Sequence, residues 1–136
     1  MADNSTSDIR NIVLCGHGGA GKTMLAEAML HKAGAVNRLG LVADGTTASD
    51  FDPEEKERQC SLSTSVLHAT FAGKEFHIVD TPGSMDFIGG TISGIAAADL
   101  AVICINAMKG VEVMARKAWE LAGDMGLGRM IAICRM

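Results

Sequence analysis

The sequence predicts an α/β domain with a mostly parallel sheet, one antiparallel strand and helices on both faces. Apolar runs of strand length alternate with helical patterns along the chain, which is typical of a parallel sheet covered by helices. One pair of runs is joined only by Ala72-Gly73, and so short a connection indicates an antiparallel hairpin. With 136 residues, 48% of them hydrophobic, the chain is long enough for one core and too short for two.

The first part of the chain reads as a strand, a helix and a long irregular segment. Residues 9–15, IRNIVLC, form a continuous apolar run of strand length. Residues 22–33 have helical spacing, and Gly34 follows as a stop signal. The predicted apolar face of this helix is Met24, Leu25, Ala28 and Met29. Residues 36–61 are rich in Gly, Thr, Ser, Asp and Pro, and loops of that length are uncommon unless functional. Their charged run, residues 54–58, is most simply a solvated loop or short helix, and the alternative is a mobile switch segment that becomes ordered against Mg²⁺ and a partner.

The second part completes the sheet. Apolar or alternating runs predict the hairpin strands 62–71 and 74–79, and later strands over 99–106 and 130–134. Helices are predicted over 86–97 and 111–125. The apolar residues of the last helix, at three- and four-residue spacing, are Val111, Met114, Ala118, Leu121 and Met125.

Composition narrows the class of protein. A net charge of −4 argues against a basic surface that coats nucleic acid, so no direct sequence-specific nucleic-acid binding is expected. The four cysteines lack the spacing of a metal site and are expected to be free thiols in a reducing compartment. Residues 1–8 are polar and expected to be disordered, and no run is long enough for a membrane span. We therefore expect a cytoplasmic protein with no membrane partner.

The stretch GHGGAGKT, residues 16–23, predicts a phosphate-binding loop between a strand and a helix. Its glycines let backbone N–H groups surround a phosphate, and the following helix N-terminus adds a positive dipole. Lys22 is expected to reach the β- and γ-phosphates, and the Thr23 hydroxyl to bind Mg²⁺. The predicted binding residues are Gly16, His17, Gly18, Gly19, Ala20, Gly21, Lys22 and Thr23. The alternatives are a glycine-rich turn without a ligand and, for His17, a purely structural role.

The stretch DTPG, residues 80–83, follows another strand and predicts a second contact with the same phosphates. Asp80 is expected to hold Mg²⁺, and Gly83 can present its N–H to the γ-phosphate because it has no side chain. Thr81 and Pro82 complete this predicted binding segment. A plain turn would explain only the Pro-Gly pair. Motor-type and ABC-type ATPases generally carry a second acid after the aspartate, so the pattern favours a GTPase switch over an unrelated P-loop ATPase.

Taken together, these motifs resemble those of elongation factor G-like translational GTPases. The resemblance rests on GHGGAGKT, AGAVNRLG, DGTTASDFDPEEKER, DTPG followed by DF, and GVEVMARKAWELA, and it covers nearly the whole chain from residue 9. It implies a P-loop GTPase domain, incomplete over residues 9–136, that binds GTP or GDP with Mg²⁺. It also implies a ribosome partner, reached through domains that are absent here. By this resemblance Ser61 joins Thr23 and Asp80 as a metal ligand.

Four departures from the family pattern bear on catalysis. The resemblance implies that Lys22 and Gly83 stabilise charge during hydrolysis, while Ser84 stands where most relatives carry a water-orienting histidine. Because such groups contribute roughly 10²–10⁴-fold to rate, slow turnover in isolation is expected. The other departures are Gly18 and Cys60 in the apolar gate, Gly19 in place of an aspartate, and Gln59 in place of a glycine.

The guanine-reading motif of the family, NKxD, aligns with Cys134 and Arg135, and its aspartate lies past Met136. The preference for guanine is therefore an expectation from the resemblance. The alternative to a GTPase is a non-hydrolysing remnant that binds nucleotide or serves as an interaction fragment.

Overall fold

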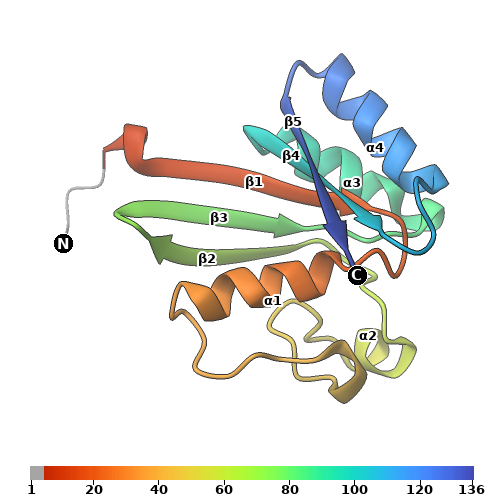
Figure 1. Cartoon of the computed structure of the whole chain (residues 1–136), viewed down its shortest axis with the longest axis horizontal. Coiled ribbons are helices and arrows are strands. Elements are labelled where there is room, and N and C mark those ends of the chain that lie inside the picture. The colour runs from red at the N-terminus through yellow and green to blue at the C-terminus, as the bar shows by residue number, and fades with distance from the viewer. Residues whose placement is uncertain (1–4) are drawn as a thin grey trace.

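The computed structural model describes residues 5–136 as one sheet with helices on both faces (Figure 1). The five strands lie in the order β2-β3-β1-β4-β5. Their bounds are β1 Ile9–Gly16, β2 Ser65–Phe71, β3 Lys74–Asp80, β4 Leu100–Asn106 and β5 Gly128–Cys134. β3, β1, β4 and β5 run parallel, and β2 pairs antiparallel with β3. The predicted α/β fold with one antiparallel strand is confirmed.

Within the described residues, α-helices and short 3-10 turns connect the strands. The helices are α1 Lys22–Lys32, α2 Pro53–Arg58, α3 Ile88–Ala96 and α4 Val113–Asp124. The 3-10 turns are η1 Thr6–Asp8, η2 Val42–Asp44 and η3 Met85–Phe87. Helix α1 packs on one face of the sheet, while α3 and α4 pack on the other (Figure 1). No helix within residues 5–136 is both long enough and apolar enough to cross a membrane.

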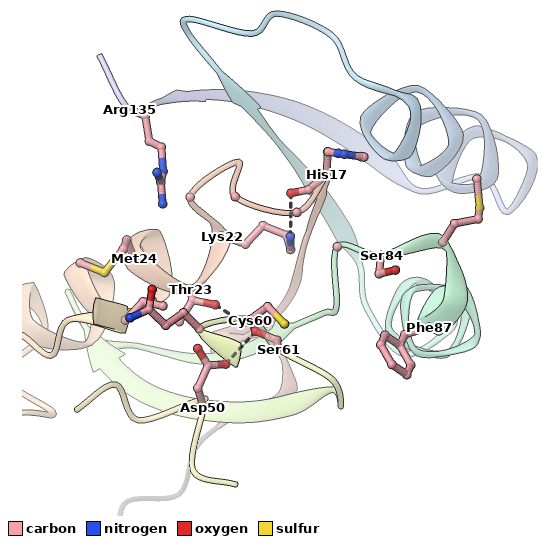
Figure 2. Close-up of a pocket in the computed structure, with 17 residues that line it drawn as sticks. His17, Lys22, Thr23, Met24, Asp50, Cys60, Ser61, Ser84, Phe87 and Arg135 are labelled. Atoms are coloured by element: carbon pink, nitrogen blue, oxygen red, sulfur yellow. Dashed lines mark hydrogen bonds between the residues drawn. The ribbon is translucent and has the colours of Figure 1, made fainter. Parts of the chain in front are cut away.

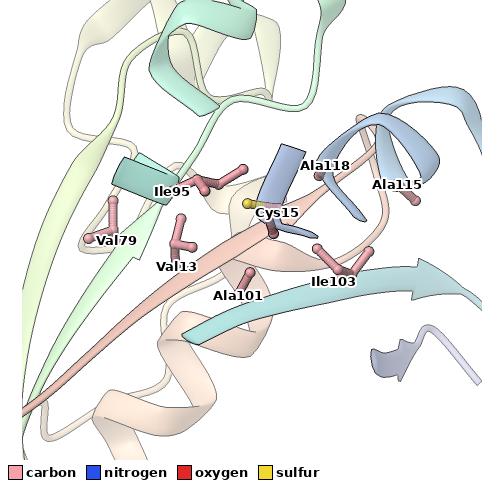
Figure 3. Close-up of a cluster of buried hydrophobic side chains, with 9 residues drawn as sticks. Val13, Cys15, Val79, Ile95, Ala101, Ile103, Ala115 and Ala118 are labelled. Atoms are coloured by element: carbon pink, nitrogen blue, oxygen red, sulfur yellow. The ribbon is translucent and has the colours of Figure 1, made fainter. Parts of the chain in front are cut away.

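The core consists of two apolar layers separated by β1. Side chains of a strand alternate between its faces, so Ile12 and Leu14 pack toward α1 whereas Val13 and Cys15 pack toward α3 and α4. Figure 3 shows the second layer, in which alanines of α4 approach the sheet closely. This buried central strand fixes the position of its carboxyl end, where Gly16 begins the phosphate loop.

The structure corrects several details of the predicted elements. In α1 the buried apolar residues are Ala26 and Leu30, and Ala28 is exposed, because the i, i+4 row through Ala26 is the one that faces β1. Val111 and Met125, predicted on the apolar face of the last helix, lie just outside α4 and are exposed.

Two segments that the sequence left irregular are ordered. Residues 53–58 form α2, which begins with Pro53 and a capping box between Asp52 and Glu55. Residues 6–8, expected to be disordered, form η1, and Asp8 pairs with Lys74 at 2.5 Å. That contact to β3 ties the segment to the sheet. The expectation of disorder for residues 1–4 concerns residues outside the described part of the chain.

Candidate functional site

The phosphate loop connects β1 to α1 at the carboxyl edge of the sheet. Its backbone takes positive φ at Gly16, Gly19 and Gly21, at 143°, 74° and 103°, a region that favours glycine. The loop also lies against the ends of neighbouring strands: a Cβ on Gly21 would lie 2.9 Å from Cβ of Cys134 at the end of β5. The glycines therefore serve both the curvature of the loop and its close packing on the sheet.

Lys22 is held across this loop. Its side chain is buried, and Nζ donates to the carbonyl oxygens of Gly16 and His17, each at 3.1 Å. Figure 2 shows the bond to His17. Burial lowers the pKa of Lys22, and the negative charge of Asp80 counteracts that effect. The ammonium group is thus positioned at the mouth of the loop by backbone acceptors alone.

Hydroxyl and carboxylate groups from three segments meet beside Lys22. Thr23 Oγ1 donates to Asp80 Oδ2 at 2.8 Å and lies 3.2 Å from Ser61 Oγ. Ser61 Oγ donates to Asp50 Oδ1 at 2.7 Å. Ser49 Oγ donates to Asp80 Oδ2 at 3.0 Å. The sequence-predicted metal ligands Thr23, Ser61 and Asp80 are therefore brought together, with Asp50 as a fourth member.

Two oxygens of this cluster are buried without a hydrogen-bond partner, namely Asp80 Oδ1 and Asp50 Oδ2. Burial raises the pKa of Asp80 to about 6, against the lowering effects of the Thr23 hydrogen bond and the Lys22 charge. Burial also raises the pKa of Asp50. A cation would compensate both carboxylates, and hard oxygen donors of this kind suit Mg²⁺. Among the described residues no group of three or more His, Cys, Asp or Glu side chains forms a metal cluster, so any ion here relies on hydroxyls and a bound ligand as well.

The DTPG segment packs directly on the phosphate loop. A Cβ on Gly83 would lie 2.5 Å from the backbone nitrogen of Gly18 and 2.6 Å from Lys22 Nζ, so only glycine fits between them. Thr81 and Pro82 are buried; Thr81 Oγ1 donates to the carbonyl oxygen of Leu14 at 2.8 Å, and the Pro82 carbonyl accepts from Thr91. These two residues anchor the segment to the core and do not face the cavity.

A cavity of about 440 Å³ lies between the phosphate loop, residues 50–61 and the turn after Gly83 (Figure 2). Its lining includes nine residues that the sequence analysis singled out: His17, Gly18, Gly19, Gly21, Lys22, Thr23, Ser61, Gly83 and Ser84. Gly16, Ala20, Asp80, Thr81 and Pro82 are outside the lining. For Asp80 the reason is that Thr23 and Ser49 cover one of its oxygens.

Ser84 is engaged with its own turn. Its hydroxyl donates to Asp86 Oδ2 and accepts from the Asp86 backbone N–H, both at 3.3 Å, as the N-cap of η3. The side chain lines the cavity, yet its donor and one of its two acceptor lone pairs are used within the turn. A water-positioning role would require this hydroxyl to leave its cap.

Sequence reasoning missed two buried acids that hold residues 36–63 in place. Glu27 of α1 accepts from the backbone N–H groups of Gly40 and Ala48. Glu55 of α2, expected to be solvated, is buried and accepts from the backbone N–H groups of Leu62 and Ser63 at 2.9 and 3.1 Å. The D-x-x-E spacing of Asp52 and Glu55 is a capping-box signal that was available in the sequence. No comparable signal marked Glu27.

The cavity also includes two residues outside the predicted site, Asp50, which no sequence signal marked, and Arg135, which aligns with the guanine-reading motif. Asp50 and Arg135 line it from a loop and from the end of β5, and Figure 2 shows the Arg135 side chain on the Met24 side. His17 contacts Glu112, which precedes α4, at 3.7 Å, while its Nδ1 is buried without a partner. These contacts come from residues far apart in the chain.

Comparison with known proteins identifies the family. Residues 7–136 match the family described as Elongation factor Tu GTP binding domain. The chain is 38% identical over 133 residues to an elongation factor G-like protein of Mycobacterium tuberculosis, covering 98% of this chain and 19% of that protein. It is 34% identical over 135 residues to the mitochondrial ribosome-releasing factor 2 of Yarrowia lipolytica, covering 99% of this chain and 17% of that protein.

Solved structures agree with these matches. A crystal structure from Thermus thermophilus superposes with a TM-score of 0.91 at 40% identity, covering 95% of this chain and 20% of that one. A bacterial selenocysteine-specific elongation factor shares the fold, with a TM-score of 0.72 at 21% identity over 93% of this chain and 19% of that one. The chain thus spans about a fifth of the length of these relatives. It belongs to the EF-Tu-type GTP-binding domain family and is homologous, over nearly its whole length, to the N-terminal G domain of elongation factor G-like proteins.

Proposed function

We propose that this chain binds GTP and GDP together with Mg²⁺ and hydrolyses GTP as part of a ribosome-linked switch. The observation that carries the proposal is the cluster of Thr23, Asp50 and Asp80 beside Lys22, because it leaves two buried carboxylate oxygens without partners next to a cavity of nucleotide-phosphate size. Two buried acids, each with one oxygen that lacks a partner, are costly, and a bound cation would reduce that cost. Family membership supports the choice of a guanine nucleotide.

Different residues would bind the phosphates and the metal ion. Backbone N–H groups of residues 18–23 and the start of α1 would bind the phosphates, and Lys22 would exchange its loop carbonyls for phosphate oxygens. Thr23, Ser61 and Asp80 would hold Mg²⁺, with Asp50 supporting Ser61 through their hydrogen bond. The ion would neutralise charge on the β- and γ-phosphates. Gly83 places its backbone within reach of Lys22, where it can respond to the γ-phosphate.

A second candidate function is nucleotide binding without hydrolysis. The observation that favours it is the engagement of Ser84 with Asp86, which uses the only hydrogen-bond donor of the side chain at the position where the family resemblance implies a water-orienting residue. In the GTPase proposal the ribosome supplies the group that helps to orient the attacking water. The chain would act in the cytoplasm. The names of the relatives, which refer to elongation and to ribosome release, support that partner.

Competition binding tests the nucleotide proposal. Fluorescent GTP would be displaced by GTP, GDP and ATP, with and without Mg²⁺; we expect a preference for guanine nucleotides and tighter binding with Mg²⁺. Lys22→Ala should weaken binding on the order of 100-fold, because it removes charge-assisted hydrogen bonds. The exposed residue Lys32 supplies the control, Lys32→Ala. An ATP preference, or affinity unchanged in Lys22→Ala, would overturn the proposal.

Single-turnover hydrolysis separates the two candidates. The GTPase proposal expects slow phosphate release by the chain alone and faster release with ribosomes. Ser84→His should raise the rate by about tenfold or more, because it restores the longer side chain at that position. Tight GTP binding with no turnover in any of these conditions would favour the binding-only function.

A further inference from the structure

A pair of histidines faces a different part of the sheet from the nucleotide cavity. His68 of β2 and His77 of β3 are direct partners in the antiparallel register, and their ring centres are 5.4 Å apart with the planes tilted by 39°. The residues next to them, such as Ala69 and Ile78, pack toward α1, so both imidazoles lie on the opposite face. His68 is exposed and His77 is half-buried. β2, β3 and β1 lie side by side here (Figure 1).

A relay of hydrogen bonds fixes the proton position on His77. The Asp99 carboxylate can only accept, and it accepts from the side-chain amide nitrogen of Asn11 at 3.1 Å and from the Asn11 backbone N–H at 3.3 Å. The carbonyl oxygen Oδ1 of Asn11 therefore points at Nδ1 of His77, 2.9 Å away. An amide oxygen is only an acceptor, so Nδ1 must be the protonated nitrogen. In the neutral ring Nε2 then carries the free lone pair.

The hydrogen bond at Nδ1 of His77 is one that histidine metal ligands share. Such histidines donate their second ring N–H to a protein acceptor, which fixes the tautomer and the ring orientation. Two imidazoles that share one tetrahedral zinc at Zn–N of about 2.0–2.1 Å have ring centres about 5 Å apart. Within residues 5–136 no hydrogen bond occupies Nε2 of His77 or either nitrogen of His68.

We propose that His68 and His77 form a surface binding site for a borderline transition-metal ion, with Zn²⁺ as the reference ion and Asn11 and Asp99 as positioning residues. Water completes the coordination. Imidazole nitrogen suits Zn²⁺, Cu²⁺ and Ni²⁺, whereas Mg²⁺ prefers oxygen, so this site and the nucleotide-linked oxygen cluster select different ions.

Calorimetric titration of the 136-residue chain with Zn²⁺ tests the site. The background is Cys60→Ser, which removes an exposed thiol, and excess Mg²⁺ is present to compete at the oxygen cluster. We expect an event with a stoichiometry of one ion per chain that His68→Asn weakens by at least about tenfold. His31→Asn changes an exposed histidine near the end of α1, outside the pair, and should leave the event unchanged. Zinc binding that is equally strong in His68→Asn would overturn the proposal.

The hydrogen bonds from Asp99 through Asn11 to His77 can be tested separately from zinc binding, by the tautomer of His77. Long-range ¹H–¹⁵N spectra of the neutral side chains should show His77 as the Nδ1–H tautomer; the Nε2–H tautomer would overturn the assignment. Asn11→Ala should lower zinc affinity by about 10–100-fold while the two histidines remain. If Asn11→Ala fails to fold, the exposed His68→Asn variant and the tautomer measurement still decide the matter. A packed pair of rings that keeps the Asn11 hydrogen bond would show the same tautomer but no zinc response, and that outcome would overturn the metal site.

Discussion

The two walls of the nucleotide cavity are held in different ways. The phosphate-loop wall is local: Lys22 is fixed by carbonyls five and six residues earlier, and the loop follows directly from buried β1. The opposite wall, residues 36–61, depends on two buried acids, Glu27 and Glu55. Asp50 of the second wall lines the cavity, whereas Asp80, at the end of β3, lies behind the first wall and outside the lining. A preformed wall thus faces one whose order depends on a few hydrogen bonds, which is the behaviour expected of a segment that rearranges.

The strongest test of this difference is Glu55→Ala. The change removes the shared acceptor of the Leu62 and Ser63 N–H groups, at a cost of about 1–3 kcal/mol in total, because Ser63 is exposed and water can replace part of what is lost. We expect hydrogen exchange to accelerate in residues 49–63 while amides of β1 keep their protection. Glu57→Ala, an exposed position on the same helix, is the control. Uniform loss of protection across the sheet would show that the two walls are one cooperative unit.

A second test disturbs the contact between the DTPG segment and the phosphate loop. In Gly83→Ala the new Cβ would lie 2.5 Å from the Gly18 nitrogen, so the DTPG segment or the loop must shift. We expect a loss of about 1–3 kcal/mol in unfolding free energy and a larger loss of GTP binding than of GDP binding. Thermal unfolding and competition binding measure the two effects. Gly89→Ala meets nothing within 4 Å and should leave both unchanged or slightly improved.

A third test asks whether the loop wall takes part in metal binding. Asp50→Asn keeps the shape of the side chain and removes its charge, so the stimulation of nucleotide binding by Mg²⁺ should fall by about tenfold. The measurement is nucleotide affinity across a Mg²⁺ series. Asp44→Asn, an exposed acid in the same segment, should behave like the unaltered chain. An unchanged Mg²⁺ response in Asp50→Asn would show that the charge of Asp50 does not help to hold the ion.

The smallest expected effect concerns the start of β1, far from either wall. The hydrogen bond and charge of Lys74 lower the pKa of Asp8 below its ordinary value of 3.8. A lowered folded-state pKa adds stability above pH 3.8, and that stability is lost as the pH falls through the folded-state pKa. Lys74→Ala should therefore reduce stability slightly at about pH 7 and flatten its decline near about pH 3. Chemical denaturation at both pH values checks the sign, and a loss that is equal at both would contradict it.

The parts of this molecule that could be predicted from sequence are those with local signals. The strands and the phosphate loop follow from apolar periodicity and glycine spacing, because the residues that matter are neighbours in the chain. Thr23, Ser61 and Asp80 also meet as expected, since two of the three lie at the carboxyl edge of adjacent strands. The family resemblance added Ser61, which periodicity alone does not mark.

The parts that escaped prediction depend on distant contacts. Glu27 is an ordinary polar residue in a helical pattern, and only the return of residues 40–48 over α1 explains its burial. The sequence does not show whether the Ser84 hydroxyl caps η3 or is free toward the cavity. That depends on its hydrogen bond to Asp86, which only the structure shows. The histidine relay joins β1, β3 and the start of β4, which are separated by many residues in sequence.

The contact between Gly21 and Cys134 has a consequence for how this domain can be varied. Because a Cβ at position 21 would sit 2.9 Å from Cβ of Cys134, the side chain that ends β5 and the residue that starts α1 share one small volume. Changes at these two positions are therefore epistatic: a branched residue at 134 displaces the loop unless position 21 stays glycine. Any change to the side chain that ends β5 is therefore also a change to the glycine-rich loop that precedes α1.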